Sequence, residues 1–230
     1  MPATGIAAVS RSLSSRFLEG LAPSDLSTIL GAASQRRYLA HSVIVNQGQP
    51  ADHLFLLAKG RARFFLLTEE GKKILLHWIT PGEIFGGAAL ASKSSVYLVS
   101  TEVVKDTIAL VWTRAVIRDL TARFPLLLEN TLLTASDYLA WYVAAHAALI
   151  CQTARQRLAH LLACLARTIG QKVPGGVEID VTNEELAGAA NITPFTASRL
   201  LSDWQSHGAL AKRRGKLLLR SPERLFLHIA

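Results

Sequence analysis

Cysteine is scarce in this 230-residue chain, which contains only Cys151 and Cys164. Two cysteines can neither build a disulfide scaffold nor supply the four thiolates of an iron–sulfur cluster. Both lie in apolar sequence of helical type, where we expect buried, unreactive thiols. The sequence therefore argues against an iron–sulfur cofactor and leaves a redox switch as the alternative.

Long hydrophobic runs are also missing. The most apolar stretch, Tyr138 to Cys151, spans 14 residues and contains His146, and it is too short to cross a bilayer. No charged-then-apolar leader begins the chain, so we expect no export. We therefore predict a cytoplasmic protein without a membrane partner.

Acidic residues are few, since 17 Asp and Glu stand against 25 Lys and Arg, a net charge of +8. The surplus is concentrated in residues 193–230, which hold seven Lys and Arg against Asp203 and Glu223. A basic segment of this kind favours a polyanion such as nucleic acid. Half of the residues are apolar, so the chain can also bury a sizeable core.

Residues 15–112 predict a domain of many short strands. The β-rich runs lie at 43–45, 54–57, 62–67, 74–79 and 107–112. Gly48, Gly60, Gly71 and the pair Pro81–Gly82 separate them, because glycine adopts positive φ at tight corners. Repeated strand-and-turn spacing favours a barrel or a sandwich. We expect two short helices before it, at about 15–21 and 24–33.

A long helix is predicted from Pro125 to about residue 150. Its apolar residues follow one another at alternating spacings of four and three, which is a heptad stripe that packs against another helix. The stripe consists of Leu128, Leu132, Ala135, Leu139, Tyr142, His146 and Leu149. The other faces are apolar too, so we expect one face on the β domain and the stripe against a second copy. The alternative is a stripe that packs only on its own β domain.

Two helix starts follow each other closely near the C-terminus. Thr182 and Glu185 have the spacing of a capping box and predict a short helix over 183–190. Asn191 suits the helix end because asparagine tolerates the left-handed conformation. Thr193 and Pro194 then suit the start of a second helix, which we expect to end near 206. Two helices joined by so short a turn predict a helix-turn-helix.

The second of these helices has two different faces. Leu200, Leu201 and Trp204 are expected to face the core. The remaining face carries Phe195, Thr196, Ser198, Arg199 and Gln205. After Gly208, residues 209–211 and 217–219 predict a hairpin whose tip, 212–216, is basic. Such a hairpin is the wing of a winged helix, and its cations would lie along phosphates.

The residues resemble the CRP/FNR family of dimeric regulators from about residue 15 to 228. The resemblance rests on Gln47-Gly48, Gly60-Arg61, Gly71, the run Pro81-Gly82-Glu83-Ile84-Phe85-Gly86, the run Val181 to Ala187, and Ser198-Arg199-Leu200-Leu201. It implies an α+β fold with an N-terminal β-roll (a double-stranded, cupin-like β-helix), a long dimerisation helix and a C-terminal winged helix-turn-helix. We place these parts at 1–122, 123–151 and 152–230.

The resemblance also implies a mechanism. A small effector binds in the β-roll beside the long helix, shifts the dimer helices and turns the two DNA-binding heads towards major grooves one turn apart. It implies double-stranded DNA with a pseudo-palindromic site and makes RNA polymerase a candidate partner. The effector pocket is expected at Phe85, Gly86, Gly87, Ala88, Tyr97, Leu98 and Tyr142.

The expected pocket departs from that of cyclic-AMP sensors, which present a Glu for the ribose and an Arg-Ser pair for the phosphate. Here the Glu position is Gly87, followed by Ala88, and the Arg-Ser positions fall near Tyr97 and Leu98. A buried phosphate without its Arg loses the pairing that offsets desolvation. The sequence therefore argues against cyclic AMP, and haem through His77 or His146 stays open without support from a Cys–His pair. His146 on the stripe could also sense pH.

The recognition helix departs as well. Where many family members place Arg and Glu, this chain has Pro194 and Phe195. Phe195 can make only apolar contact, for instance with a thymine methyl, whereas Arg199 matches a family Arg that contacts guanine or phosphate. The DNA-contacting residues are predicted to be Thr182, Thr193, Phe195, Thr196, Ser198, Arg199, Lys212, Arg213 and Lys216. Internal packing of Phe195 and simple exposure of Ser198 are the alternatives.

Two other functions compete with an effector-controlled regulator. A DNA-binding dimer could need no effector, with the β-roll as a scaffold or a protein-interaction surface. An enzyme could use the roll as a cupin-like metal site, but His41, His53 and His77 are scattered and no His-x-His pair occurs. We therefore predict a regulator without catalytic residues and without a metal site.

Overall fold

The structure is a computed structural model that describes residues 14–71, 73–213 and 215–226. It divides into two compact units, residues 1–140 and 141–230, and the boundary falls inside one long helix. Arg214, which is part of the predicted basic hairpin tip, lies outside the described residues.

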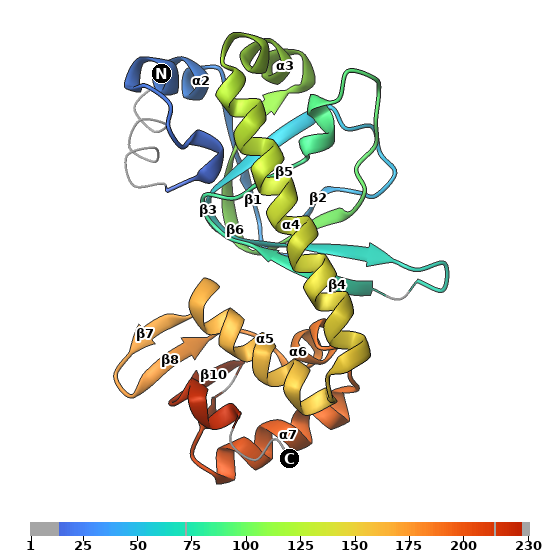
Figure 1. Cartoon of the computed structure of the whole chain (residues 1–230), viewed down its shortest axis with the longest axis vertical. Coiled ribbons are helices and arrows are strands. Elements are labelled where there is room, and N and C mark those ends of the chain that lie inside the picture. Colours follow the sequence, from blue (N-terminus) through green and yellow to red (C-terminus); the bar gives the residue numbers. More distant parts are fainter. Residues whose placement is uncertain (1–13, 72, 214, 227–230) are drawn as a thin grey trace. The chain divides into compact units, whose positions relative to one another are not determined.

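The first unit joins short helices to an antiparallel sheet. Its elements are η1 (Arg16–Leu18), α2 (Pro23–Gly31), β1 (Ser34–Tyr38), β2 (Val43–Val45), β3 (His53–Leu67), β4 (Lys73–Ile79), β5 (Ile84–Phe85), η2 (Gly87–Leu90), β6 (Ser100–Thr113), α3 (Arg114–Arg123) and the first half of α4 (Pro125–Cys151) (Figure 1). The two predicted N-terminal helices correspond to η1 and α2, and the predicted long helix corresponds to α4.

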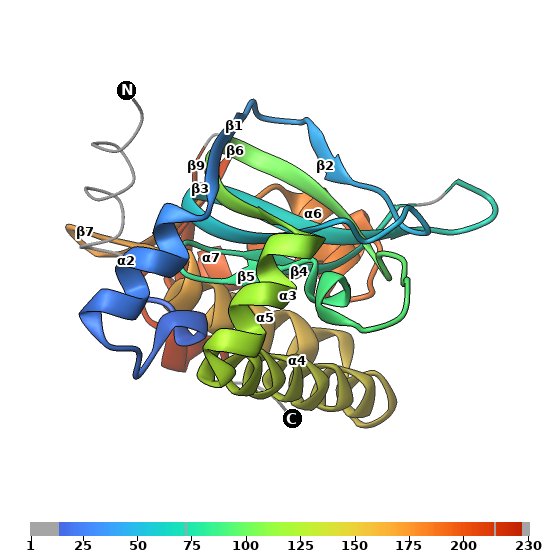
Figure 2. The same ribbon diagram turned by 90° about the horizontal axis from the view of Figure 1, so that it is seen from above.

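Six strands among the described residues form one sheet in the order β1-β6-β3-β4, with β2 paired to β6 and β5 paired to β3. In Figure 2 the strands β1, β6 and β3 lie side by side. Buried side chains from these strands make two apolar clusters, one around Trp112 and one around Phe55. Leu127 of α4 belongs to the first cluster and Tyr138 of α4 packs against the second, so α4 helps to close the roll.

Gly60 does not form the predicted corner between two strands. β3 runs unbroken from His53 to Leu67, so the predicted strands 54–57 and 62–67 are one strand. The φ of Gly60 is 97°, and the pairing register with β6 shifts on both sides of it. A Cβ atom at this position would lie 2.4 Å from the carbonyl oxygen of Asp106. The glycine therefore allows a bulge and a close backbone approach within one long strand, which its turn-like sequence does not reveal.

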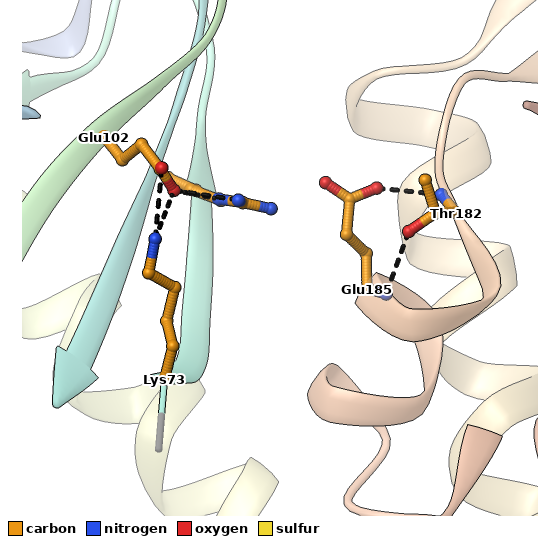
Figure 3. Close-up of polar contacts among 5 residues, drawn as sticks. Lys73, Glu102, Thr182 and Glu185 are labelled. Atoms are coloured by element: carbon orange, nitrogen blue, oxygen red, sulfur yellow. Dashed lines mark hydrogen bonds and ion pairs between the residues drawn. The ribbon is translucent and has the colours of Figure 1, made fainter. Parts of the chain in front are cut away.

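Glu102 of β6 is a buried carboxylate that ties three strands together. Arg63 of β3 donates to its Oε2 from Nε at 2.8 Å, and Lys73 of β4 donates to both of its carboxylate oxygens at 3.0 Å. Figure 3 shows the contact between Lys73 and Glu102. Burial raises the pKa of Glu102, but the hydrogen bonds from Lys73 and Arg63 lower it more, so the net shift is downward.

The second unit contains the end of α4 followed by helices that pack on a small sheet. Its elements are α5 (Ala154–Thr168), β7 (Gln171–Val173), β8 (Gly176–Ile179), α6 (Asn183–Ala189), α7 (Pro194–Ser206), β9 (Leu210–Arg213), β10 (Lys216–Leu219) and η3 (Pro222–Leu225). The four strands pair in the order β7-β8-β10-β9.

Candidate nucleic-acid interface

The helix α6 begins with the predicted capping box. The backbone N–H of Glu185 donates to the Thr182 hydroxyl at 3.2 Å, and the backbone N–H of Thr182 donates to the Glu185 carboxylate at 2.8 Å (Figure 3). These bonds satisfy two backbone donors at the helix start. The local sequence thus fixes where α6 begins.

Hydrogen bonds from Arg157 of α5 hold the backbone of the turn between α6 and α7. Asn191 adopts the predicted left-handed conformation with φ 49°. The guanidinium of Arg157 donates to the carbonyl oxygens of Ala190 at 2.9 Å and of Asn191 at 3.1 Å. Thr193 then caps α7 through the backbone N–H of Thr196 at 3.1 Å, and Pro194 occupies the first turn. The turn is therefore rigidly connected to the core of its unit.

The helix α7 separates its residues into a buried and an exposed face, as predicted. Leu201 and Trp204 are fully buried and Leu200 nearly so. On the other face Phe195 is 78% exposed and Arg199 is exposed as well. These two side chains lie four residues apart, so they are neighbours one helical turn apart.

Thr196 and Ser198 are less available than Phe195 and Arg199. Both are half-buried. The hydroxyl oxygens of Thr196 and Thr193 lie 2.9 Å apart and share a hydrogen bond. The carbonyl oxygen of Ser198 accepts from the Ser202 hydroxyl at 2.9 Å.

The predicted wing is the hairpin of β9 and β10, and its cations point in two directions. Lys212 Nζ donates to the Ser202 hydroxyl at 2.8 Å and to the Ser198 carbonyl at 3.3 Å, so it lies against α7. Lys216 Nζ and Arg213 Nη1 lie 2.6 Å and 3.3 Å from the carboxylate of Glu178 on β8. The sequence pattern does not predict these contacts with Glu178.

Strand alternation explains this split. Successive side chains of a strand point to opposite faces, so Lys212 and Arg213 must diverge. Arg213 pairs with Lys216 across the hairpin, and Glu178 lies opposite Leu218, two residues from Lys216 on the same face. The carboxylate is therefore placed beside both cations by the register of the sheet.

The residues of the predicted effector pocket occupy different environments. Phe85 is buried and its ring stacks on Phe55 at a centroid distance of 4.6 Å. The hydroxyl of Tyr97 lies 3.1 Å from both the backbone N–H and the carbonyl oxygen of His53. Leu98 is 77% exposed. Tyr142 belongs to the second unit, where its ring lies edge-on to Trp141.

Gly86, Gly87 and Ala88 surround the start of η2. The φ of Gly86 is 80°, and a Cβ atom there would lie 2.5 Å from the carbonyl oxygen of His53. The positions that would bind the ribose and the phosphate of a cyclic nucleotide, Gly87 and Tyr97–Leu98, carry neither a carboxylate nor a guanidinium. The side chains offered there thus lack the charge that a buried phosphate needs.

A cavity of about 220 Å³ lies elsewhere in the first unit. It is lined by Ser14, Arg16 and Phe17, by the loop 81–84, and by Thr134, Asp137 and Tyr138 of α4. Glu83 in this lining accepts from the backbone N–H and the hydroxyl of Thr80 at 2.6 and 2.7 Å. Burial raises the pKa of Glu83, while the hydrogen bonds from His77 and Thr80 lower it more, so the net shift is downward.

The predicted dimer stripe is exposed on the surface of α4. Its leucines, Leu128, Leu132, Leu139 and Leu149, are 44–65% exposed, Ala135 and His146 are also exposed, and Tyr142 is half-buried. A continuous row of exposed leucines on one helix is typical of a protein–protein contact. Of the two histidines considered for haem, His77 lies 3.5 Å from the Glu83 carboxylate and His146 is on this stripe.

The described residues also bear on two alternatives, a membrane protein and a metal site. No helix there is both long and apolar enough to span a bilayer. Among the same residues, no group of three or more His, Cys, Asp or Glu side chains is placed to hold a metal ion. The scattered His41, His53 and His77 do not gather into such a group.

Each of the two units contains a match to a known domain family. Residues 35–124 match the cyclic nucleotide-binding domain, and residues 156–226 match the Crp-like helix-turn-helix domain. The chain is 28% identical to the cyclic AMP receptor protein of Thermus thermophilus over 206 residues, covering 90% of this chain and 93% of that protein. It is 25% identical to the anaerobic regulatory protein of Bacillus subtilis over 217 residues, covering 89% and 88%.

A solved structure shares the fold. The c-di-GMP responsive global regulator CLP of Xanthomonas campestris matches with a TM-score of 0.76 over 87% of this chain and 100% of that chain, at 19% identity. Together with the two domain matches, it confirms the predicted α+β class with an N-terminal cyclic-nucleotide-type roll and a C-terminal helix-turn-helix.

Proposed function

The chain belongs to the CRP/FNR family of transcription regulators, and we propose that it binds specific DNA sequences as a homodimer. The relatives that match over most of the chain are transcription regulators, a non-enzyme family, in agreement with the prediction of no catalytic activity. The observation that carries the proposal is the exposed pair Phe195 and Arg199 on a helix whose opposite face is buried.

The pair suits base recognition in the major groove. Arg199 can donate to the O6 and N7 atoms of guanine, and the Phe195 ring can pack on a thymine methyl group. Side chains one helical turn apart have Cβ atoms about 5–6 Å apart, and neighbouring bases on a strand are about 3.4 Å apart. We therefore expect a guanine and a thymine within two base pairs of each other in each half-site.

The remaining predicted contacts position the domain on the backbone. Thr182 and Thr193 lie at helix N-termini, where backbone N–H groups favour phosphate. Thr196 and Ser198 lie between the two exposed residues along α7. Lys212, Arg213 and Lys216 are proposed to contribute phosphate contacts, which set the salt dependence of binding.

Dimerisation through α4 is supported by its exposed apolar stripe. Two-fold symmetry would pair two DNA-binding domains, so the site would be pseudo-palindromic with half-sites about 34 Å apart. In this proposal 1–122 is the sensor, 123–151 the dimerisation helix and 152–230 the DNA-binding domain. The proposal also includes RNA polymerase as a partner and a cytoplasmic location.

The effector is proposed to be something other than cyclic AMP. The relatives include a cyclic AMP receptor protein and a c-di-GMP responsive regulator, but Gly87, Ala88, Tyr97 and Leu98 supply no charged group for a phosphate. A DNA-binding dimer that needs no effector is the second candidate. The same lack of charged groups in the expected pocket favours it. DNA affinity measured with and without a metabolite extract distinguishes the two, because only the first responds.

The test is the variant Arg199→Ala in the full-length protein. Loss of a bidentate base contact of about 1–3 kcal/mol should weaken binding to the preferred sequence about 5- to 150-fold and leave random DNA nearly unaffected. The control is Arg167→Ala, which removes the same charge from an exposed position of α5. Fluorescence anisotropy gives the affinities and light scattering the dimer mass; equal affinity of both variants for the preferred sequence would contradict the proposal.

A further inference from the structure

Glu178 links β8 to the wing through two cations. Its carboxylate lies 2.6 Å from Lys216 Nζ and 3.3 Å from Arg213 Nη1. The Glu178 side chain is only 13% exposed, whereas those of Lys216 and Arg213 are 44% and 55% exposed. The carboxylate thus lies largely beneath the two cations that face solvent.

This arrangement makes the carboxylate dependent on its cations. The two cations lie over the carboxylate and compensate its charge, so it depends on them for both cover and pairing. The hydrogen bond from Lys216 lowers the pKa of Glu178, so the group stays ionised at neutral pH. Cations that moved away to a DNA phosphate would leave Glu178 uncompensated.

Lys212 provides an internal contrast in the same hairpin. Among the described residues, its ammonium group donates to two oxygens of α7, both neutral, at 2.8 and 3.3 Å. A neutral hydroxyl and a carbonyl do not cancel its charge. Lys212 therefore remains available to a phosphate beside α7, whereas Arg213 and Lys216 are both paired with the Glu178 carboxylate.

We propose that Glu178 competes with DNA phosphates for Arg213 and Lys216 and thereby sets how strongly the wing binds DNA of any sequence. The inference rests on the proposed function. Sequence-independent affinity comes from phosphate contacts, while specificity comes from base contacts on α7. Weaker phosphate binding by the wing lowers the affinity for all sequences about equally, so Glu178 sets the sequence-independent part of the affinity while α7 sets the discrimination.

The salt dependence of binding measures this competition. Each phosphate contact contributes about 0.9 to the slope of log affinity against log salt concentration. Glu178→Gln removes the charge and keeps the shape, which frees two cations. The slope for random DNA should become steeper by up to about two, so the gain in affinity over wild type should shrink by up to about tenfold between 50 and 200 mM salt.

Three further variants isolate the cause. Glu223→Gln makes the same charge change at an exposed site that bonds only locally to Ser221, and it should keep the wild-type slope. Glu178→Gln combined with Arg213→Gln and Lys216→Gln should lose the added steepness. Glu178→Asp keeps the negative charge and should remain closer to wild type than to Glu178→Gln.

The full-length dimer is titrated with its preferred duplex and with a random duplex at several salt concentrations. Equal slopes for Glu178→Gln and Glu223→Gln would overturn the inference, as would weaker binding of Glu178→Gln to random DNA at low salt. The second outcome would mean that Glu178 only orders the wing. Failure of the proposed function is a separate result, because it appears as a wild-type protein with no preferred sequence.

Discussion

Two glutamates, one in each unit, bind two cations from neighbouring strands. Glu102 in the first sheet contacts Arg63 and Lys73, and Glu178 in the second sheet contacts Arg213 and Lys216. Both carboxylates are almost equally buried, with side chains 10% and 13% exposed. The arginines differ, because Arg63 is 19% exposed whereas Arg213 is 55% exposed, while the lysines are alike at 41% for Lys73 and 44% for Lys216.

This difference separates a structural cluster from one that can exchange its partners. Lys73 is further restrained by the Phe65 ring, whose centroid lies 4.3 Å from its ammonium group. Burial of Arg63 and the ring beneath Lys73 thus restrain the cations of Glu102, while Arg213 of the Glu178 cluster faces solvent where a phosphate could approach. We expect Glu102 to control stability and Glu178 to control DNA binding.

The largest expected effect follows from Glu102→Gln. Removing one member of a buried ion cluster leaves Arg63 without its charge partner, and the free energy of unfolding of the first unit should fall by about 3 kcal/mol. Hydrogen exchange with mass spectrometry on β3, β4 and β6 localises the loss, at fixed protein concentration because dimerisation affects stability. Glu69→Gln, an exposed charge-matched control, should change little; an equal loss in both variants would contradict the structural role.

The next effect is a loss of stability of the first unit in acid. The pKa values of Glu102 and Glu83 are both lowered from the ordinary value of 4.5. A lowered pKa in the folded state adds stability above the unfolded pKa, and this stability is lost as the pH falls through the folded value. Denaturant unfolding should therefore show decreasing stability below about pH 4.5, with a shallower decrease in Glu102→Gln; an unchanged pH dependence in that variant would exclude Glu102 as a cause.

A smaller effect is expected from the cap of α6. Thr182→Ala removes the acceptor for the backbone N–H of Glu185 and should lower the stability of the second unit by about 1 kcal/mol. Thr182→Ser keeps the hydroxyl and should retain most of that stability. The measurement is the hydrogen-exchange protection of α6 in both variants. It also serves as a sensitivity control, because α6 lies in the same unit as Glu178.

The smallest effect on stability is expected from Glu178→Gln. Its cations are solvent-exposed, and ion pairs of exposed groups contribute little to folding. Exchange protection of β8 and β10 should therefore match that of the Glu223→Gln control, even though the salt slope of DNA binding changes. A loss of protection as large as that of Glu102→Gln would remove the distinction between the two clusters.

Elements that depend on local chemistry could be predicted from the sequence. Thr182 and Thr193 mark the starts of α6 and α7, and Asn191 marks the turn between them, because each acts on backbone groups within four residues. The corner predicted at Gly60 is wrong, because a glycine with positive φ suits a bulge as well as a turn. Only strand pairing distinguishes the two.

The candidate site was predicted in part for the same reason. Phe195 and Arg199 share a face through helical periodicity, which the sequence displays directly. Glu178 lies 35 and 38 residues from Arg213 and Lys216, and its position beside them depends on the register of two strand pairs. The alternation that separates Lys212 from Arg213 was visible in the sequence, but the carboxylate opposite them was not.

The central claim is that α7 recognises DNA sequence in a two-fold symmetric dimer. Selection of bound duplexes from random DNA by the purified full-length protein, with and without haem, candidate gases and nucleotides, tests it most directly. The account predicts an inverted repeat whose half-sites are centred about 10 base pairs apart, each with a guanine that loses its preference in Arg199→Ala. Selected sequences without a shared motif, or a motif unaffected by Arg199→Ala, would contradict it.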